Sequence, residues 1–256
     1  MSCGVRGLVA ICACLLVVCA SAVDAKGPKE DHQSNACKQI LRDRFEELHQ
    51  DAEPFDELET AGVVGLWLEE YLAYEVYSAF QSKYCDNLLE VEDVCVFANL
   101  ANAENQHLKL IDRLIREYDL PAQEPPALDS PWWDEEYGPV VDQGDTFVGA
   151  LQAGVLVEDG ELCALSGILA WSDPTANGTA HADVALVVQN LAAGDRNHLR
   201  ALAWALVNQG EVYSVECMDP EEVAEIVAAE MERHVVYDEY GEVLATCGGS
   251  SRRGGF

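Results

Sequence analysis

The chain has few basic residues. Lys and Arg together number 15 against 46 Asp and Glu, and the formal net charge of the 256 residues is −31. Such a surface repels the phosphates of nucleic acids and the headgroups of anionic membranes, so we exclude both as partners. The same acidity attracts cations, although an acidic coat that only keeps the protein soluble explains it equally well.

Long apolar runs are also scarce. One such run lies between Leu8 and Cys19, follows Arg6 and precedes the small residues 20–22. This order is typical of a secretory signal peptide, and the run is too short to span a bilayer comfortably. We predict a signal peptide over 1–22, a secreted, extracellular protein and no membrane insertion of the mature chain.

The sequence lacks Cys-x-x-Cys, so zinc sites and thioredoxin-like redox sites of that type have no support. Cleavage after the signal peptide leaves six cysteines, an even number that suits three disulfides in an exported chain. Sequence alone leaves their pairing open, but we favour Cys85 with Cys95, which would close the turn between two helices. The six are Cys37, Cys85, Cys95, Cys163, Cys217 and Cys247.

One eleven-residue pattern occurs twice, at 99–109 and 190–200. Both copies begin Asn-Leu-Ala and end with an amide residue, His, Leu and a basic residue. Each places an acid three residues before the histidine, which pairs Glu104 with His107 and, in the second copy, Asp195 with His198. Residues at i and i+3 share one face of a helix, so each copy can offer two ligands to one metal ion.

A second matched segment precedes each copy. It consists of a glycine, three apolar residues and two acids, and it lies at 65–70 and at 154–159. The repeat therefore predicts two helical hairpins. In each hairpin, one helix supplies a single carboxylate and the other carries the acid-x-x-His pattern.

Helical spacing predicts which acid of each pair faces the core. Glu69 and Glu158 share their helix faces with apolar residues, whereas Glu70 is set aside and Asp159 is assigned to the surface. Both acid-x-x-His pairs also fall on apolar faces. Four acids and two histidines should therefore converge in one core: Glu69, Glu104, His107, Glu158, Asp195 and His198.

Buried carboxylates without partners cost several kcal/mol each by the usual order of magnitude, and these core faces supply no Lys or Arg. Divalent cations would supply the missing charge. Carboxylate and imidazole ligands without thiolates favour iron or manganese over a structural zinc. We predict a centre of two iron ions, or manganese, bridged by Glu104 and Asp195, with Glu69 and Glu158 as terminal ligands.

The periodicity predicts an all-α fold, a four-helix bundle with one long crossover and extra terminal helices. The four long helices are expected at about 59–84, 92–118, 145–171 and 183–208. Prolines interrupt helix formation throughout 119–144, which therefore forms the crossover. Asp219 followed by proline is the N-cap signal of a further helix. The domain limits are 23–58 for an N-terminal lead-in segment, 59–232 for the bundle plus C-terminal helix, and 233–256 for a flexible tail.

Four stretches resemble the ferritin-like superfamily and, within it, an uncharacterised "domain of unknown function" family: 69–77, 97–108, 150–159 and 190–202. The resemblance implies a ferritin-like bundle, in which one Glu from each of two helices and an acid-x-x-His from each of the others hold two metal ions. The family often has Glu where Gln189 stands and Ser where Asp195 stands. The sequence leaves open which of these two residues supplies the ligand of the fourth helix.

Three functions remain after this reading. The first is oxidation of Fe(II) by oxygen or peroxide, in the manner of a ferroxidase or a peroxidase-like di-iron oxidoreductase. The second is extracellular metal scavenging without turnover. The third is a metal-free acidic bundle that binds a cell-wall or matrix partner, a role that suits the glycosylation acceptor Asn177-Gly178-Thr179. No Ser-His-Asp set or phosphate-binding loop points to another class.

Overall fold

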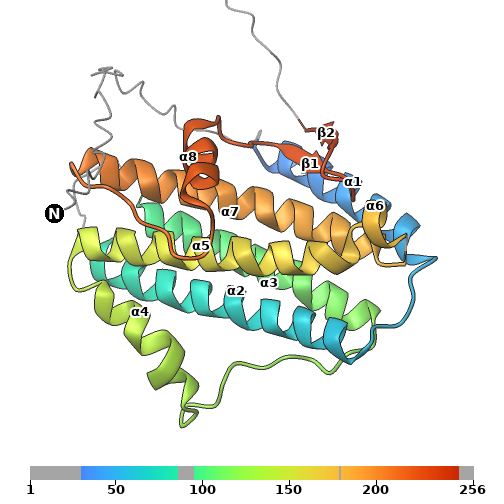
Figure 1. Cartoon of the computed structure of the whole chain (residues 1–256), viewed down its shortest axis with the longest axis horizontal. Coiled ribbons are helices and arrows are strands. Elements are labelled where there is room, and N and C mark those ends of the chain that lie inside the picture. Colours follow the sequence, from blue (N-terminus) through green and yellow to red (C-terminus); the bar gives the residue numbers. More distant parts are fainter. Residues whose placement is uncertain (1–29, 86–94, 179, 248–256) are drawn as a thin grey trace, which may run out of the picture.

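Four long helices form an antiparallel bundle in the computed structural model, which describes residues 30–85, 95–178 and 180–247 (Figure 1). They are α2 (Glu57–Tyr84), α3 (Val96–Glu117), α5 (Phe147–Ser172) and α7 (Ala182–Asn208). Helix α2 packs against α3 and α5, while α7 packs against the same two helices from the opposite corner. The predicted all-α class is confirmed, and the predicted signal peptide lies outside the described residues.

Side chains cap the starts of two of the four bundle helices, α2 and α5. The Asp56 carboxylate accepts from the backbone N–H groups of Leu58 and Glu59, and the Glu59 carboxylate accepts from the backbone N–H of Asp56. At the start of α5, the Thr146 hydroxyl accepts from the backbone N–H of Gly149 at 3.0 Å. These caps satisfy N–H groups that a helix leaves unpaired at its first turn. They place both helix starts within two residues of the predicted positions.

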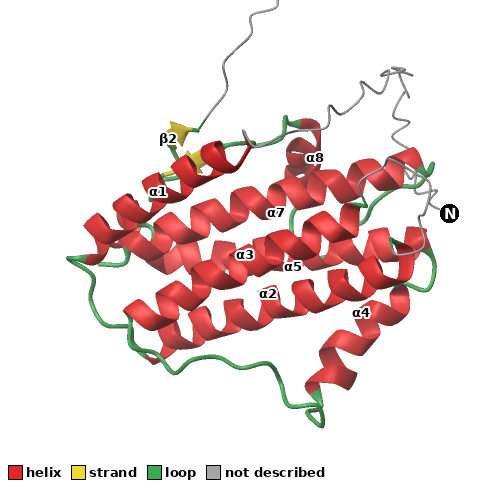
Figure 2. Ribbon diagram, turned by 180° about the vertical axis from the view of Figure 1, so that it is seen from behind, coloured by secondary structure: helices red, strands yellow, loops and turns green. Residues whose placement is uncertain are grey.

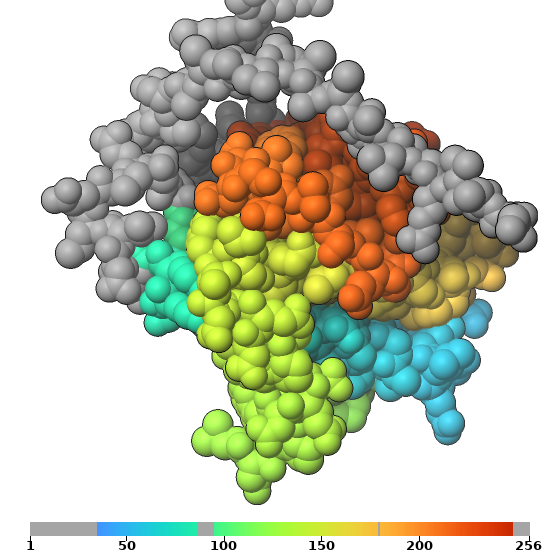
Figure 3. Space-filling model, turned by 60° about the vertical axis from the view of Figure 1, so that its left-hand side comes forward, coloured from blue at the N-terminus to red at the C-terminus, as the bar shows by residue number. Residues whose placement is uncertain are grey.

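The crossover between α3 and α5 contains one π-helical turn (Trp133–Tyr137) followed by the short helix α4 (Gly138–Gln143). It is the part of the surface that projects away from the bundle in Figure 3. The Trp132 ring lies 5.7 Å from the Tyr71 ring of α2, between ring centroids, and so anchors the crossover to the bundle. A four-residue helix, α6 (Pro174–Asn177), lies between α5 and α7.

Helices α1 (Glu30–His49) and α8 (Pro220–Ala228) pack against α7, and α1 lies within the predicted lead-in segment 23–58. The Asp219 side chain caps α8 as predicted. Strands β1 (Val235–Tyr237) and β2 (Val243–Thr246) form an antiparallel hairpin.

The hairpin differs from the flexible tail expected from 233 onward. The Asn190 side chain of α7 holds it, because its Oδ1 accepts from the Tyr237 N–H at 3.0 Å and its Nδ2 donates to the Tyr237 carbonyl at 2.8 Å. A disulfide from Cys247 to Cys37 of α1 fixes its far end. Residues 248–256 lie outside the described residues.

Three disulfides link the six cysteines, with Cα–Cα distances of 5.4, 5.8 and 6.3 Å. The expected pair Cys85–Cys95 is confirmed, and the others are Cys37–Cys247 and Cys163–Cys217. This use of cysteine indicates an oxidising environment. Within the described residues, every helix is too short or too polar to cross a bilayer.

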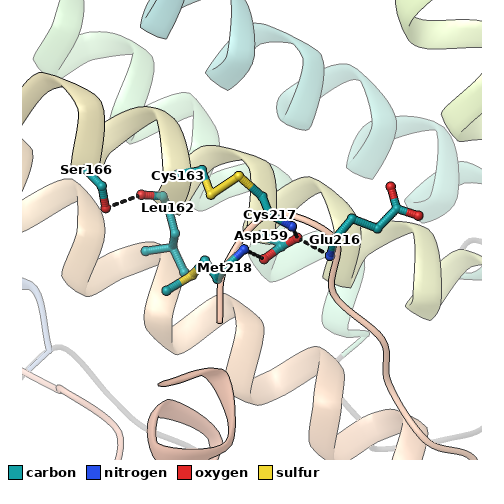
Figure 4. The surroundings of a disulfide bond; sticks show 7 residues. All are labelled: Asp159, Leu162, Cys163, Ser166, Glu216, Cys217 and Met218. Atoms are coloured by element: carbon teal, nitrogen blue, oxygen red, sulfur yellow. Dashed lines mark hydrogen bonds between the residues drawn. A yellow bond between two sulfur atoms is a disulfide. The ribbon is translucent and has the colours of Figure 1, made fainter. Parts of the chain in front are cut away.

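Asp159 shows a further difference from the sequence prediction, which placed it on the surface. Its side chain is 1% exposed and accepts backbone N–H groups from Glu216 and Cys217 at 2.7 Å and from Met218 at 2.9 Å (Figure 4). The loop after α7 covers this face of α5 and is joined to it by the neighbouring disulfide of Cys217. Helical spacing cannot reveal that a distant loop will cover a polar face.

Candidate metal centre

Seven ionisable side chains meet inside the bundle, and all four long helices contribute to them. The five carboxylates are at most 1% exposed, and the two histidine side chains are 10% and 12% exposed. They lie on α2 (Glu70), α3 (Glu104 and His107), α5 (Glu158 and Glu161) and α7 (Asp195 and His198). We call these seven residues the acidic cluster.

Three carboxylates from three helices surround the Nδ1 atom of His107. The Oε2 atom of Glu104 lies 2.8 Å from it, the Oε2 atom of Glu70 3.1 Å, and the Oδ1 atom of Asp195 3.3 Å. The contact from Glu70 has the geometry of a hydrogen bond. One imidazole nitrogen therefore faces oxygen ligands from three directions.

His198 has a similar environment in the other half of the acidic cluster. Its Nδ1 atom lies 2.8 Å from the Oε1 atom of Glu104 and 3.4 Å from the Oε2 atom of Glu158. The two imidazole rings are 5.4 Å apart between centroids, at an interplanar angle of 24°. Glu104 thus directs one oxygen toward each histidine and lies between the two halves.

Most carboxylate oxygens of the acidic cluster have no hydrogen-bond partner. Both oxygens of Glu104, Glu161 and Asp195 are in this state. The 2.8 Å contacts of Glu104 are close enough for ion pairing but not aligned as hydrogen bonds, so we describe them as charge contacts. Buried oxygens without partners are costly, and native proteins rarely leave several together.

The charge of the acidic cluster is also unbalanced. Within the described part of the chain, its five carboxylates form ion pairs with no basic side chain except His107 and His198. Three negative charges would remain even if both imidazoles were protonated. Carboxylate and imidazole donors with excess negative charge fit divalent metal ions.

Ligand atoms in the acidic cluster form two compact sets, one with Glu70, His107 and Asp195, and one with Glu104, Glu158 and His198. The atoms of each set lie within 4.8 Å of one another. Glu161 completes two further sets, one with Glu70 and Glu104 and one with Glu158 and Asp195. The acidic cluster therefore contains several overlapping sets of donors that could hold a metal ion.

Burial and mutual repulsion shift the pKa values of the acids. Burial raises the pKa of Glu70 to about 7, and it raises the pKa of Glu161 and Asp195 well above the ordinary range. The pKa of Glu104 is lowered despite its burial, because the imidazoles of His198 and His107 flank it. Without a cation, this arrangement favours retained protons, which a metal ion would displace.

Tyr77 and Gly194 position two members of the acidic cluster. The Tyr77 hydroxyl, fully buried, donates to the Oε1 atom of Glu158. A Cβ atom on Gly194 would lie only 2.5 Å from the Nε2 atom of His107, so the absence of a side chain there lets the imidazole approach α7. The matching residue of the first repeat is Ala103.

The structure brings together five of the six predicted residues: Glu104, His107, Glu158, Asp195 and His198. It does not bring in Glu69, whose predicted core-facing position is corrected. Glu69 is exposed and lines shallow hollows beside Leu72, while its neighbour Glu70 is buried and points into the acidic cluster. Apolar residues occupy a wide stripe of α2, so spacing alone favoured the wrong neighbour.

Sequence reasoning missed Glu161. It stands three residues after Glu158, an acid-x-x-acid spacing that repeats the acid-x-x-His logic of α3 and α7 and could have identified it. The two alternatives for the fourth-helix ligand, Gln189 and Asp195, lie in different surroundings. Asp195 lies in the acidic cluster, while the Gln189 side chain lies against Gly241 in the hairpin turn.

A known protein family matches the part of the chain that forms the bundle. The model of an uncharacterized protein domain, DUF2202, matches residues 59–230. The chain belongs to this family. All seven residues of the acidic cluster lie within the matched range, whereas α1 and the hairpin lie outside it.

One relative of this chain is the uncharacterized protein MJ0754 of Methanocaldococcus jannaschii. It is 31% identical over 188 residues, a stretch that covers 71% of this chain and 92% of the relative. The crystal structure of hypothetical protein MJ0754 from Methanococcus jannaschii DSM 2661 is similar, with a TM-score of 0.59 and 28% identity. That match covers 70% of this chain and 97% of the other. Neither description names an activity.

Proposed function

We propose that the protein binds two divalent metal ions, iron or manganese, in the acidic cluster. The observation that supports this most strongly is the set of buried carboxylate oxygens without hydrogen-bond partners, which two cations would neutralise. The resemblance to ferritin-like proteins agrees, because their dinuclear centres use the same kinds of ligand on four helices.

The positions of the side chains suggest a role for each. Glu104 is the candidate bridging ligand, because it directs one oxygen toward each histidine. Asp195 is the second candidate, since its Oδ1 atom lies 3.3 Å from His107 and 4.0 Å from His198. Tyr77 holds Glu158 in place through its hydroxyl proton.

Elemental analysis of protein purified from its own culture medium tests the proposal. We expect about two iron or manganese ions per chain, as in other dinuclear four-helix bundles. Glu70→Gln should lower the bound metal, while the adjacent Glu69→Gln should not, because only Glu70 lies in the acidic cluster. Equal metal content in both variants, or a metal-free wild-type protein, would contradict the proposal.

We further propose that the centre oxidises Fe(II). Two bound ferrous ions would supply electrons to oxygen or peroxide, and the protein's part is to hold the carboxylates and imidazoles in a buried site. The measurement is oxygen consumption after addition of Fe(II). Metal uptake without oxygen consumption would instead support scavenging, in which the acidic surface concentrates cations around the site.

Export of the protein is part of the same proposal. The predicted signal peptide and the three disulfides support a secreted, extracellular protein. Asn177 is exposed at the end of α6, a position that suits glycosylation. Mass spectrometry of the protein from the medium should find Val23 as the first residue and a glycan on Asn177. An uncleaved leader in the exported protein would contradict the predicted cleavage.

A further inference from the structure

A groove between α1 and α3 collects positive charge on an otherwise acidic molecule. Its volume is about 360 Å³. The two helices that form it lie on the face that comes forward in Figure 2. The whole sequence contains 15 basic residues, and five of them line this groove: Lys38, Arg42, Lys109, Arg113 and Arg116. The local charge is therefore opposite to that of the molecule.

Within the described part of the chain, four of these five side chains have no partner of opposite charge. Among the described residues, no ion pair and no side-chain hydrogen bond involves Lys38, Arg42, Lys109 or Arg116. Like charges placed together raise the free energy of the folded state. Although carboxylates are abundant in this sequence, these four basic side chains are not paired with them in the groove. A bound anion would reduce the repulsion between the four positive charges.

The walls of the groove are fixed in place before any ligand binds. The Arg113 guanidinium lies 4.2 Å from the centroid of the Phe45 ring of α1, and it also reaches the Glu46 carboxylate at 3.4 Å. Cys37, next to Lys38, forms the disulfide that joins α1 to the end of the hairpin. A preformed site loses little entropy when a ligand is bound.

From these features we infer that the groove binds a small polyanion carrying phosphate or carboxylate groups. Guanidinium groups recognise both through paired hydrogen bonds. Leu41 and Leu110, both partly buried, supply apolar surface for the carbon skeleton of such a ligand. The volume matches the lower end of small-molecule sites.

The size and surroundings of the groove favour a small ligand over an extended polyanion. Charges are screened over about 8 Å at physiological ionic strength, so the electrostatic energy of a ligand inside the groove depends mainly on the nearby basic side chains. A long polyanion would extend past them and meet the acidic remainder of the surface. Helix α1, which forms one wall, lies outside the range matched by the family, so this site is an addition to the shared domain.

Calorimetric titration of the full mature chain with fructose bisphosphate, in low-salt buffer, tests the inference. We expect saturable binding that weakens as salt is added. Arg116→Gln and Arg42→Gln, each an exposed position in the groove, should each weaken it about tenfold, the usual cost of a lost charged hydrogen bond. Arg233→Gln is the matched control, because it removes one exposed charge outside the groove and should bind as the wild type does.

Two further measurements separate this site from the acidic cluster and from other polyanions. Glu104→Ala should bind the bisphosphate as the wild type does, because Glu104 faces away from the groove into the bundle. Absence of saturable binding, or an equal loss in Arg116→Gln and Arg233→Gln, would overturn the inference. Heparin binding that the bisphosphate fails to displace would assign the groove to an extended polyanion and would also overturn it.

Discussion

At the scale of single residues, small steric and charge differences decide the composition of the acidic cluster. Glu69 and Glu70 are chemically identical neighbours, yet only Glu70 meets His107. Adjacent residues of a helix are turned by about 100° from each other, so they cannot share one face. Gly194 has a steric role, because any side chain at this position would occupy the space of the His107 ring.

Gly194→Ala should therefore displace His107 and lower both bound metal and stability. The added Cβ would meet the Nε2 atom at 2.5 Å, and overpacking of this kind typically costs about 1–3 kcal/mol. Gly167→Ala is the control, since Gly167 is helical with no heavy atom within 4 Å of the added Cβ. It should raise stability by about 0.5–1 kcal/mol. Urea unfolding and metal analysis measure both variants; unchanged metal in Gly194→Ala would contradict the proposed position of His107.

Glu161→Gln should have opposite effects on the metal-free and metal-loaded protein. Burial and the neighbouring carboxylates raise the pKa of Glu161 far above its ordinary range, so the neutral amide should raise the melting temperature of the metal-free form. The same change removes one oxygen ligand and should lower metal affinity. Melting curves with a chelator and with added metal distinguish these effects. If Glu161→Gln melted at a lower temperature than the wild-type protein in the presence of the chelator, the destabilising effect assigned to the buried Glu161 carboxyl would be wrong.

At the scale of elements, polar contacts fix the C-terminal region against α7. Glu232 accepts hydrogen bonds from Arg196 at 2.6 and 2.9 Å and from Arg200 and Tyr237 at 2.8 Å. Arg200 is 3% exposed and also donates to the carbonyl of Ile226 in α8 at 2.6 Å. One carboxylate thus connects α7 with the segment between α8 and the hairpin.

Acid should weaken this connection. Although burial opposes it, hydrogen bonding to Arg196 and Arg200 lowers the pKa of Glu232 from 4.5 to about 2. The folded form binds the proton more weakly than the unfolded form, so the stabilising contribution is complete above pH 4.5 and is lost as the pH falls toward 2. Glu232→Gln should destabilise the protein at neutral pH and flatten its pH dependence in this range. Urea unfolding of the wild-type protein and of Glu232→Gln across that pH range measures the difference in stability. If the unfolding free energies of the two proteins changed in parallel with pH, the lowered pKa assigned to Glu232 would be contradicted.

At the scale of the whole molecule, the balance of charge links stability to bound cations. The chain has a net charge of −31, and the five carboxylates of the acidic cluster are buried. Any ion that binds the folded form but not the unfolded one stabilises the protein by mass action. With the proposed metal ions bound, the folded state of this protein should therefore depend on them more than a bundle with an apolar core would.

Removal of the metal should lower the melting temperature of the wild-type protein. A ligand present at a hundred times its dissociation constant contributes about 2.7 kcal/mol, so the shift should be several degrees. Glu104→Ala, which removes the candidate bridging carboxylate, should melt at the same temperature with and without the chelator. Scanning calorimetry measures both. An equal shift in the two proteins would place the stabilising ion outside the acidic cluster.

The sequence by itself determined the helical architecture and most of the acidic cluster. The duplicated acid-x-x-His pattern gave Glu104, His107, Asp195 and His198, because a spacing of three residues fixes a shared helix face in any helix. Caps and prolines located the helices, and the spacing across one turn indicated the Cys85–Cys95 disulfide. All of these are local properties of the chain.

Only the tertiary structure decided the features that depend on which surfaces meet. It selected Glu70 over Glu69, added Glu161, and covered Asp159 with a loop that is distant in sequence. It also folded the expected tail into a hairpin through Asn190. A helical period defines the faces of a helix, but burial of a given face depends on the packing of its neighbours, and that information is spread over the whole chain.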